Sequence, residues 1–287
     1  MASMIPVKNF FRFPSRNDIA YHPKQTGFDF VSRGSKTLFV TIGDSWTWGA
    51  DLTPTQDNKY RLNHVYGNVI AKHFDYDFLN LAVGGCSNSW IAEQFSQLVK
   101  VERMMQYDTI ICVITLTEAA REFNTKWDST IDYSKWTKQN INSPADYYRL
   151  LGCINSKSCK QIANALSVSL KIKLFVGVNY VDPIGTHDLQ DILFKDTWID
   201  LFSAQINNPV QGKCYVASHW VIDRFEQIFE INPNLNKADF LTWMVEIIDN
   251  ANTRLNYISD STYFKRIHHP VASGHKCWAD YIIKSLE

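Results

Sequence analysis

Residues Thr37–Ile42 have the sequence Thr-Leu-Phe-Val-Thr-Ile and are followed directly by Gly43-Asp44-Ser45. Six β-favouring residues that end at a glycine predict a buried strand followed by a tight turn. A serine on a sharp turn between a strand and a helix has its hydroxyl at the sheet edge, where backbone N–H groups face any developing oxyanion. Asp and Ser are also favoured helix caps, so a capped turn without chemistry is the alternative. The stretch predicts a first strand with a candidate nucleophile, Ser45, at its end.

Further segments with strand or helix character surround this stretch. A largely apolar run at 108–115 is the strongest strand signal, because strands covered on both faces lack polar alternation. Apolar residues at helical spacing predict helices, of which the last, Ala272–Leu286, closes the chain. We expect the remaining strands at 77–81, 173–178 and, weakly, 255–258, and the remaining helices at 64–73, 90–105, 158–170 and 236–251.

The order of these elements predicts an α/β fold. Strands that alternate with helices form a parallel sheet covered on both faces, which is a three-layer α/β/α arrangement. We expect an irregular N-terminal arm at 1–36 and one domain at 37–287, with insertions at about 119–150 and 180–235. In such sheets ligands bind beyond the carboxyl ends of the strands. The Gly43-Asp44-Ser45 turn falls at such an end.

Composition narrows the class of partner. The 29 basic residues balance 29 acidic ones, so no excess charge favours a nucleic acid or an anionic membrane. The first residues carry no basic segment followed by an apolar run, so we expect no signal peptide. No apolar stretch approaches the ~20 residues that span a membrane. We therefore expect a soluble, cytoplasmic protein with no membrane partner, and we make no prediction of its oligomeric state.

The cysteines support the same compartment. Six are scattered along the chain without a CxxC pair, which in a chain of 287 residues favours free thiols in a reducing environment. They are Cys86, Cys112, Cys153, Cys159, Cys214 and Cys277.

A second group of chemically capable residues lies near the C-terminus. His268-His269-Pro270 is followed by Gly274-His275 and the closing helix. A histidine fixed before a proline in a loop can face a serine at the end of the first strand and take its hydroxyl proton, which a serine nucleophile requires. The alternative is a surface or core histidine without chemistry. We take His269 as the candidate base.

Together these motifs resemble the SGNH, or GDSL, hydrolases, in the family's block order and over residues 37–286. Block one matches residues 39–49 (Phe-Val-Thr-Ile-Gly-Asp-Ser-Trp-Thr-Trp-Gly), and block two matches residues 80–88 (Asn-Leu-Ala-Val-Gly-Gly-Cys-Ser-Asn). The resemblance implies a flavodoxin-like fold with a five-stranded parallel sheet, and an esterase, lipase, thioesterase or carbohydrate deacetylase that needs no metal or other cofactor. It implies Ser45 as nucleophile, His269 as base, and the N–H groups of Ser45 and Gly85 in the oxyanion hole.

The first departure from the family is in block three, where the family's Gly-x-Asn-Asp supplies an asparagine to the oxyanion hole. Here the strand ends Thr115-Leu116-Thr117-Glu118, with Thr117 at the asparagine position. A threonine hydroxyl is a shorter donor, and losing one oxyanion donor typically costs about 10²–10³ in rate. We expect Thr117 to complete the hole, with Arg121 as a further candidate that contacts substrate. A solvated or salt-bridged arginine is the alternative for Arg121.

The second departure is the acid of the triad. The family places Asp three residues before its histidine, where this chain has Arg266, or Lys265 if counted from His268. Asp260 lies further back and is our candidate for a displaced acid. The alternatives are a Ser-His dyad oriented by a backbone carbonyl, and Asp260 as a plain turn residue. Loss of the acid lowers the rate of a triad without abolishing catalysis.

Tryptophan and histidine residues near the motifs could contact substrate or could simply pack in the core. Trp46 follows the nucleophile and is our candidate for the substrate cleft, while Trp48 is expected in the core and His275 in a structural role. Further cleft candidates in the insertions are Trp127, Trp136, Trp198 and Trp220. The spacing of the histidines fits no common zinc pattern, so we expect no metal.

The sequence therefore predicts a Ser-His hydrolase that cleaves an ester through an acyl-enzyme. The substrate is a small molecule or a glycan ester, with an O-acetylated carbohydrate as first choice. One alternative is a catalytically degraded module that binds a ligand or serves in a virion, and another is acyl transfer to an acceptor other than water. The strand end 114–118, Arg121 and the Trp-containing closing helix also resemble SGNH-like proteins encoded by phages, which act on host glycans or are carried in the virion.

Overall fold

The computed structural model describes residues 7–14, 25–50, 52, 57–117, 144–179, 185–196, 198, 201, 264–265 and 269–287. The predicted helix at 236–251 and the weak strand at 255–258 lie outside the described residues, as does most of both predicted insertions.

A five-stranded, mostly parallel sheet forms the centre of the fold, in the order β1-β3-β2-β4-β5. Its strands are β1 (Asp29–Val31), β2 (Thr37–Ile42), β3 (Asp77–Asn80), β4 (Thr109–Leu116) and β5 (Ile172–Val178). The strands β3, β2, β4 and β5 run parallel, with Val40 opposite both Leu79 and Cys112. Almost every residue of β2, β3 and β4 is buried, because helices cover both faces of a parallel sheet.

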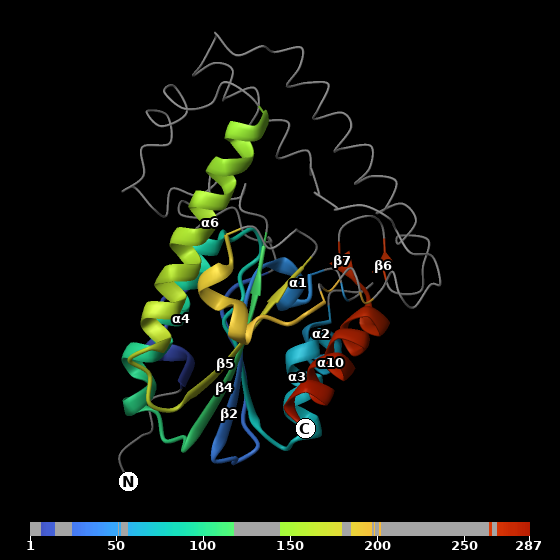
Figure 1. Cartoon of the computed structure of the whole chain (residues 1–287). Coiled ribbons are helices and arrows are strands. Elements are labelled where there is room, and N and C mark those ends of the chain that lie inside the picture. The colour runs from blue at the N-terminus through green and yellow to red at the C-terminus, as the bar shows by residue number, and fades with distance from the viewer. Residues whose placement is uncertain are drawn as a thin grey trace.

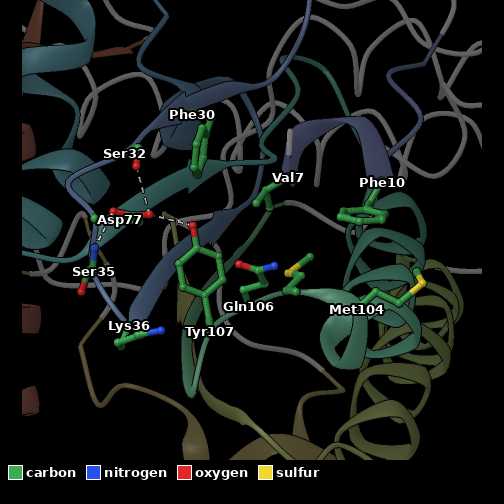
Figure 2. Close-up of a pocket in the computed structure, with 12 residues that line it drawn as sticks. Val7, Phe10, Phe30, Ser32, Ser35, Lys36, Asp77, Met104, Gln106 and Tyr107 are labelled. Atoms are coloured by element: carbon green, nitrogen blue, oxygen red, sulfur yellow. Dashed lines mark hydrogen bonds between the residues drawn. The ribbon is translucent and has the colours of Figure 1, made fainter. Parts of the chain in front are cut away.

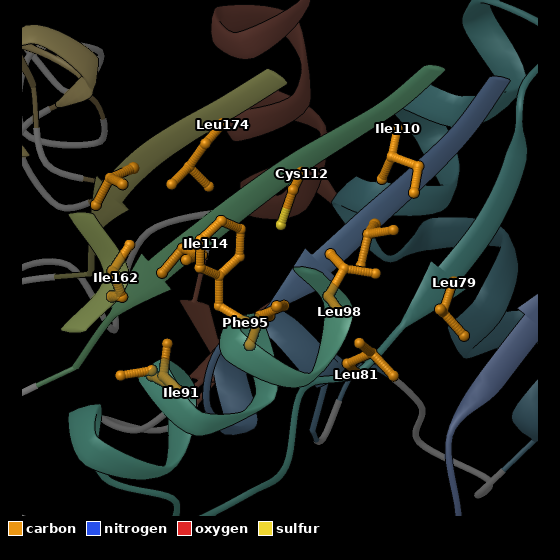
Figure 3. Close-up of a cluster of buried hydrophobic side chains, with 14 of the residues drawn as sticks. Leu79, Leu81, Ile91, Phe95, Leu98, Ile110, Cys112, Ile114, Ile162 and Leu174 are labelled. Atoms are coloured by element: carbon orange, nitrogen blue, oxygen red, sulfur yellow. The ribbon is translucent and has the colours of Figure 1, made fainter. Parts of the chain in front are cut away.

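Helices pack on the two faces and complete three layers (Figure 1). On one face lie α4 (Asn88–Val101) and α6 (Pro144–Leu166), and on the other lie α2 (Asn58–His64), α3 (Tyr66–His73) and α10 (Ala272–Leu286). Figure 3 shows the core between the sheet and α4, where Phe95 and Leu98 meet Ile110, Cys112 and Ile114. The predicted α/β/α class is confirmed.

The helix boundaries refine the sequence predictions. The predicted helix at 64–73 corresponds to α3, and α2, which ends at His64, was not predicted. The predicted helix at 90–105 is α4 followed by the 3₁₀ helix η2 (Glu102–Met104). The helix predicted at 158–170 begins earlier, at Pro144, a residue suited to a first helical turn, and ends at Leu166. The segment between this helix and β5 is held by the carboxylate of Glu102, which accepts hydrogen bonds from the N–H groups of Leu170 and Lys171. The closing helix has the predicted bounds.

The arm predicted to be irregular contains two regular elements. The 3₁₀ helix η1 (Val7–Phe10) precedes β1, and β1 pairs antiparallel with the outer edge of β3, where Phe30 lies opposite Leu79. The fifth described strand therefore comes from the arm. A strand edge left unpaired would expose a row of backbone N–H and C=O groups, and β1 satisfies the edge of β3. A second 3₁₀ helix, η4 (His187–Ile192), falls within the predicted second insertion.

None of the helices in the described ranges is both long and apolar enough to cross a membrane. Five cysteines are described, and all are free thiols: Cys86, Cys112, Cys153, Cys159 and Cys277. Burial raises the pKa of the Cys159 thiol to about 12, so this thiol stays protonated and unreactive.

Candidate active site

The candidate nucleophile sits on the turn between β2 and the short helix α1 (Ser45–Trp48). Asp44 caps this helix, and its carboxylate accepts a hydrogen bond from the N–H of Trp46 at 3.0 Å. A Cβ on Gly43 would lie 2.3 Å from Thr47 Oγ1 and 3.1 Å from the Thr115 carbonyl oxygen, so only glycine fits there. The absence of a side chain at Gly43 permits this tight turn, which leaves Ser45 at the carboxyl edge of the sheet as predicted.

His269 meets Ser45 across this edge. It lies in β7 (His269–Pro270), which pairs antiparallel with β6 (Phe264–Lys265) just before α10. Its Nε2 is 3.0 Å from Ser45 Oγ. This is hydrogen-bond distance for a base that takes a serine proton. The two residues that the sequence selected therefore come together in space.

Gly85 lies on the turn that follows β3. Backbone pairing continues past the strands, since Leu81 N–H donates to the Thr41 carbonyl at 2.8 Å and Val83 N–H to the Gly43 carbonyl at 2.9 Å. Gly85 then adopts φ +79°, in the left-handed region that glycine tolerates. Within the described residues, the Ser45 N–H and the Gly85 N–H are both without a protein acceptor.

The Thr117 side chain lies beside Asp44. Its hydroxyl donates to Asp44 Oδ2 at 3.0 Å, so its single proton is directed at a carboxylate and not at an oxyanion. The backbone of Thr117 is held by Asn88, whose Oδ1 accepts the Thr117 N–H at 2.9 Å and whose Nδ2 donates to the Thr117 carbonyl at 2.8 Å. In this arrangement the Thr117 hydroxyl holds Asp44, and its role as an oxyanion donor stays a prediction.

Asp44 is the centre of a buried polar network that sequence reasoning found only in part. Its side chain is fully buried and accepts hydrogen bonds from Trp46 N–H, Thr117 Oγ1 and, at 2.9 Å, Asn179 Nδ2. Asn179 directly follows β5 and Thr117 directly follows β4. The carboxylate therefore ties together the ends of three neighbouring strands beneath the nucleophile. A polar residue at the end of an apolar strand was the available signal for Asn179.

The tryptophans beside the nucleophile are core residues in this structure. Trp46 is buried and packs edge-on against Trp198, with ring centroids 5.5 Å apart, and Trp198 stacks on Trp278 at the same distance. Trp48 is buried as expected, with the Arg61 guanidinium 4.5 Å above its ring. These positions favour packing over substrate contact for Trp46 and Trp198.

His275 has the structural position predicted for it. The side chain is fully buried, its Nδ1 accepts the Tyr66 N–H at 3.2 Å, and its ring stacks on that of Tyr66. Burial, with smaller contributions from the charges of His269, Arg61 and His64, lowers its pKa from 6.5 to about 3. His275 is therefore neutral at pH 7, and its ring packs against those of Tyr66 and Trp198.

Several predicted site residues lie outside the described residues: Arg121, Asp260, His268, Trp127, Trp136 and Trp220. The acid of the triad and the arginine that contacts substrate stay predictions. Within the described ranges, no three His, Cys, Asp or Glu side chains gather as metal ligands would.

A concavity of about 470 Å³ opens at the other end of the sheet (Figure 2). Residues that precede or begin the strands line it, among them Lys36, Asp77 and Tyr107, together with Phe10 and Phe30 from the arm. Ser45 lies at the opposite, carboxyl edge. This concavity is therefore separate from the candidate active site.

Two solved structures resemble this chain weakly. A carbohydrate esterase, whose active site is described as displaying divergent catalytic and non-catalytic binding functions, is 12% identical with a TM-score of 0.37, and the match covers 88% of this chain and 68% of that one. Phospholipase A1 from Streptomyces albidoflavus NA297 is 11% identical with a TM-score of 0.31, covering 86% and 98%. No protein-family model and no curated protein matches the sequence. The assignment of the fold therefore rests on the sheet and helix layers of this chain.

Proposed function

We propose that this chain is a serine hydrolase of the SGNH type that cleaves an ester. The observation that carries the proposal is the 3.0 Å contact between His269 Nε2 and Ser45 Oγ, at the carboxyl edge of a parallel sheet. The N–H groups of Ser45 and Gly85, which donate to no protein acceptor within the described residues, are our candidates for the second requirement of acyl transfer, stabilisation of an oxyanion.

The reaction follows from these groups. Ser45 Oγ attacks the ester carbonyl while His269 Nε2 takes the hydroxyl proton, and the two N–H groups hold the tetrahedral oxyanion. His269 returns the proton to the departing alcohol, which leaves an acyl-enzyme. Water then attacks the acyl-enzyme with His269 again as base, which releases the acid and restores Ser45. Asp260 is the proposed acid that orients His269.

The substrate class is proposed from the family resemblance alone. A small-molecule or glycan ester fits the reaction, and O-acetylated carbohydrate is our first choice. The phage-encoded setting stays a prediction with the same basis. Neither a metal nor another cofactor enters the proposed steps.

A binding module on the same scaffold is the second candidate function. The Thr117 hydroxyl favours it, because this proton donates to Asp44 and the family's third oxyanion donor is missing from that position. The two candidates differ in the reactivity of Ser45. A hydrolase reacts covalently with a fluorophosphonate at this residue, whereas a binding module does not.

The experiment measures hydrolysis of p-nitrophenyl acetate, longer acyl esters and O-acetylated xylan, together with fluorophosphonate labelling. We expect Ser45→Ala and His269→Ala to lower kcat by about 10³-fold or more, since nucleophile and base act as a unit. Ser167→Ala and His187→Ala are matched controls at exposed positions and should hydrolyse like wild type. Asp260→Ala distinguishes a triad from a dyad.

Two outcomes would count against the hydrolase. Hydrolysis that persists in Ser45→Ala would assign the activity to another group or a contaminant. A wild-type protein that neither labels nor hydrolyses any of these esters would favour the binding module. Product analysis with added alcohols separates hydrolysis from acyl transfer.

A further inference from the structure

One residue of the N-terminal arm reaches the turn that carries Gly85. Gln25 is 2% exposed, and its side-chain Nε2 donates to the Ala82 carbonyl at 2.7 Å. Its Oε1 accepts the Gly84 N–H at 2.9 Å. One carboxamide therefore binds both a carbonyl and an N–H of the backbone immediately before Gly85.

This turn needs external support because of its sequence. Gly84 and Gly85 are consecutive glycines, which have the widest choice of backbone conformation and lose the most entropy when ordered. The Cys86 N–H closes the turn on the Val83 carbonyl at 3.3 Å, and Gly85 has φ +79° at the third position, as a type II turn requires. Rotation of the peptides around Gly84 would change the direction of the Gly85 N–H. The Gln25 side chain restrains these peptides from the side opposite the strand pairing.

We propose that Gln25 is a positioning residue for the oxyanion hole, which holds the Gly84-Gly85 turn so that the Gly85 N–H faces the reacting carbonyl. The inference rests on the proposed function of Ser45 and Gly85. It gives the N-terminal arm a part in catalysis through Gly85, without contact between Gln25 and substrate. Preorganised donors matter because the transition-state charge is stabilised only by donors that already point at it.

The competing explanation is that Gln25 simply anchors the arm. The chain offers a matched control for this, because Gln97 on α4 also joins the arm to the domain. Its Nε2 donates to the Phe10 carbonyl at 3.3 Å, far from the turn. Gln→Met at either position removes the carboxamide and keeps similar volume, so both variants weaken the arm but only one releases the turn.

The test measures kcat and KM of full-length wild type, Gln25→Met and Gln97→Met on the ester that wild type hydrolyses best, with amide hydrogen exchange of residues 82–86. We expect Gln25→Met to lower kcat roughly tenfold with little change in KM, below the ~10²–10³ that outright loss of an oxyanion donor costs. Exchange at Gly84 and Cys86, whose N–H groups are hydrogen-bonded in this turn, should become faster. Gln97→Met should change neither quantity.

Equal kcat values in wild type and Gln25→Met, or an equal fall in both variants, would overturn the inference. If Gln25→Met does not fold, Gln25→Glu takes its place, since it keeps an acceptor for Gly84 and sets a second oxygen against the Ala82 carbonyl. A wild type without Ser45-dependent hydrolysis refutes the proposed function separately. In that case amide exchange alone tests whether Gln25 orders the Gly84-Gly85 turn, and unchanged exchange in Gln25→Met would show that it does not.

Discussion

Two buried carboxylates lie at opposite ends of the same sheet. Asp44 follows the carboxyl end of β2 and is fully buried, and Asp77 is the first residue of β3 and is 4% exposed. Each is satisfied by several hydrogen bonds, as a charge removed from water requires. By burial and hydrogen bonding alone the two sites would be judged alike.

The donors around the two carboxylates differ in origin. Asp77 accepts from the N–H groups of Arg33 and Ser35 in the arm, and from the Tyr107 hydroxyl at 2.7 Å (Figure 2). It thereby fastens the arm to the amino end of the sheet. Asp44 instead collects donors from residues that follow three neighbouring strands, directly beneath Ser45. The role of a buried carboxylate therefore depends on which elements it joins and on which residues lie beside it.

The largest expected effect comes from removing each carboxylate. Asp44→Ala leaves the Trp46 N–H, the Thr117 hydroxyl and the Asn179 amide without their acceptor beneath the nucleophile, so we expect kcat to fall by about 10² or more. Asp77→Ala should leave kcat within about threefold of wild type. Both should lower the free energy of unfolding by about 2–4 kcal/mol, because buried donors lose their partner. Ester hydrolysis and urea unfolding of both variants measure these effects.

The comparison fails if both variants lose kcat to the same extent in the folded state. Asp44→Asn is the milder variant to use if Asp44→Ala does not fold, since Asn is also a good helix cap. Near-UV circular dichroism confirms that the folded fraction is equal before rates are compared.

His275, near the carboxyl end of the sheet, and Asp77, at the amino end, should lose their contributions to stability at different pH values. Burial and nearby positive groups lower the pKa of His275 from 6.5 to about 3, so the unfolded chain takes up this proton before the folded chain does. Its contribution to stability is therefore complete above about pH 6.5 and falls by about 1.4 kcal/mol per pH unit as the pH drops towards 3. Burial raises the pKa of Asp77, but its hydrogen bonds outweigh this and lower the pKa below 3.8, so its contribution is lost only below that pH.

Unfolding in urea at pH 7 and pH 5 tests whether the contribution of His275 is lost at a higher pH than that of Asp77. Wild type should lose roughly 2 kcal/mol from the His275 site between these values. His275→Asn, which offers an oxygen to the Tyr66 N–H, should show a correspondingly smaller loss, and Asp77→Asn should keep the wild-type loss. A pH dependence that is unchanged in His275→Asn would show that another group titrates in this range.

The elements that sequence reasoning predicted well are those with local signals. The continuous apolar runs of β2 and β4 are characteristic of buried parallel strands, and the glycine after β2 predicts the turn that carries Ser45. The pairing of Ser45 with His269 was proposed from the need of a serine nucleophile for a base and was strengthened by the family resemblance, because nothing local to either residue links them. Helix α6 was predicted too short, since the residues after Pro144 are mixed in polarity.

The parts that escaped prediction depend on partners distant in sequence. β1 is only three residues long and is a strand because the edge of β3 accepts it. The hydroxyl direction of Thr117 is set by Asp44 Oδ2 and by the hold of Asn88 on its backbone, 29 residues away in sequence. Gln25 carries no sequence signal, because its two backbone partners lie 57 and 59 residues further on. Such long-range polar contacts are invisible to periodicity and turn chemistry.

The smallest expected effects come from removing one hydroxyl donor at each end. Thr117→Val deletes the donor to Asp44 Oδ2, and Tyr107→Phe deletes the donor to Asp77 Oδ2. Each should lower the free energy of unfolding by about 1 kcal/mol, the usual net value of such a bond. Only Thr117→Val should lower kcat, by roughly tenfold, because Asp44 alone underlies the nucleophile turn.

The size of the Thr117→Val effect also distinguishes the two roles of this residue, as an oxyanion donor and as a support for Asp44. A true oxyanion donor would cost about 10²–10³ in kcat on removal, whereas a residue that only holds Asp44 should cost less. Thr117→Ser keeps the hydroxyl and should restore most of the rate. A loss near 10³ in Thr117→Val would mean that the hydroxyl turns from Asp44 to the oxyanion during the reaction. In that case the carboxyl end of the sheet would differ from the amino end in its mobility as well as in its neighbours.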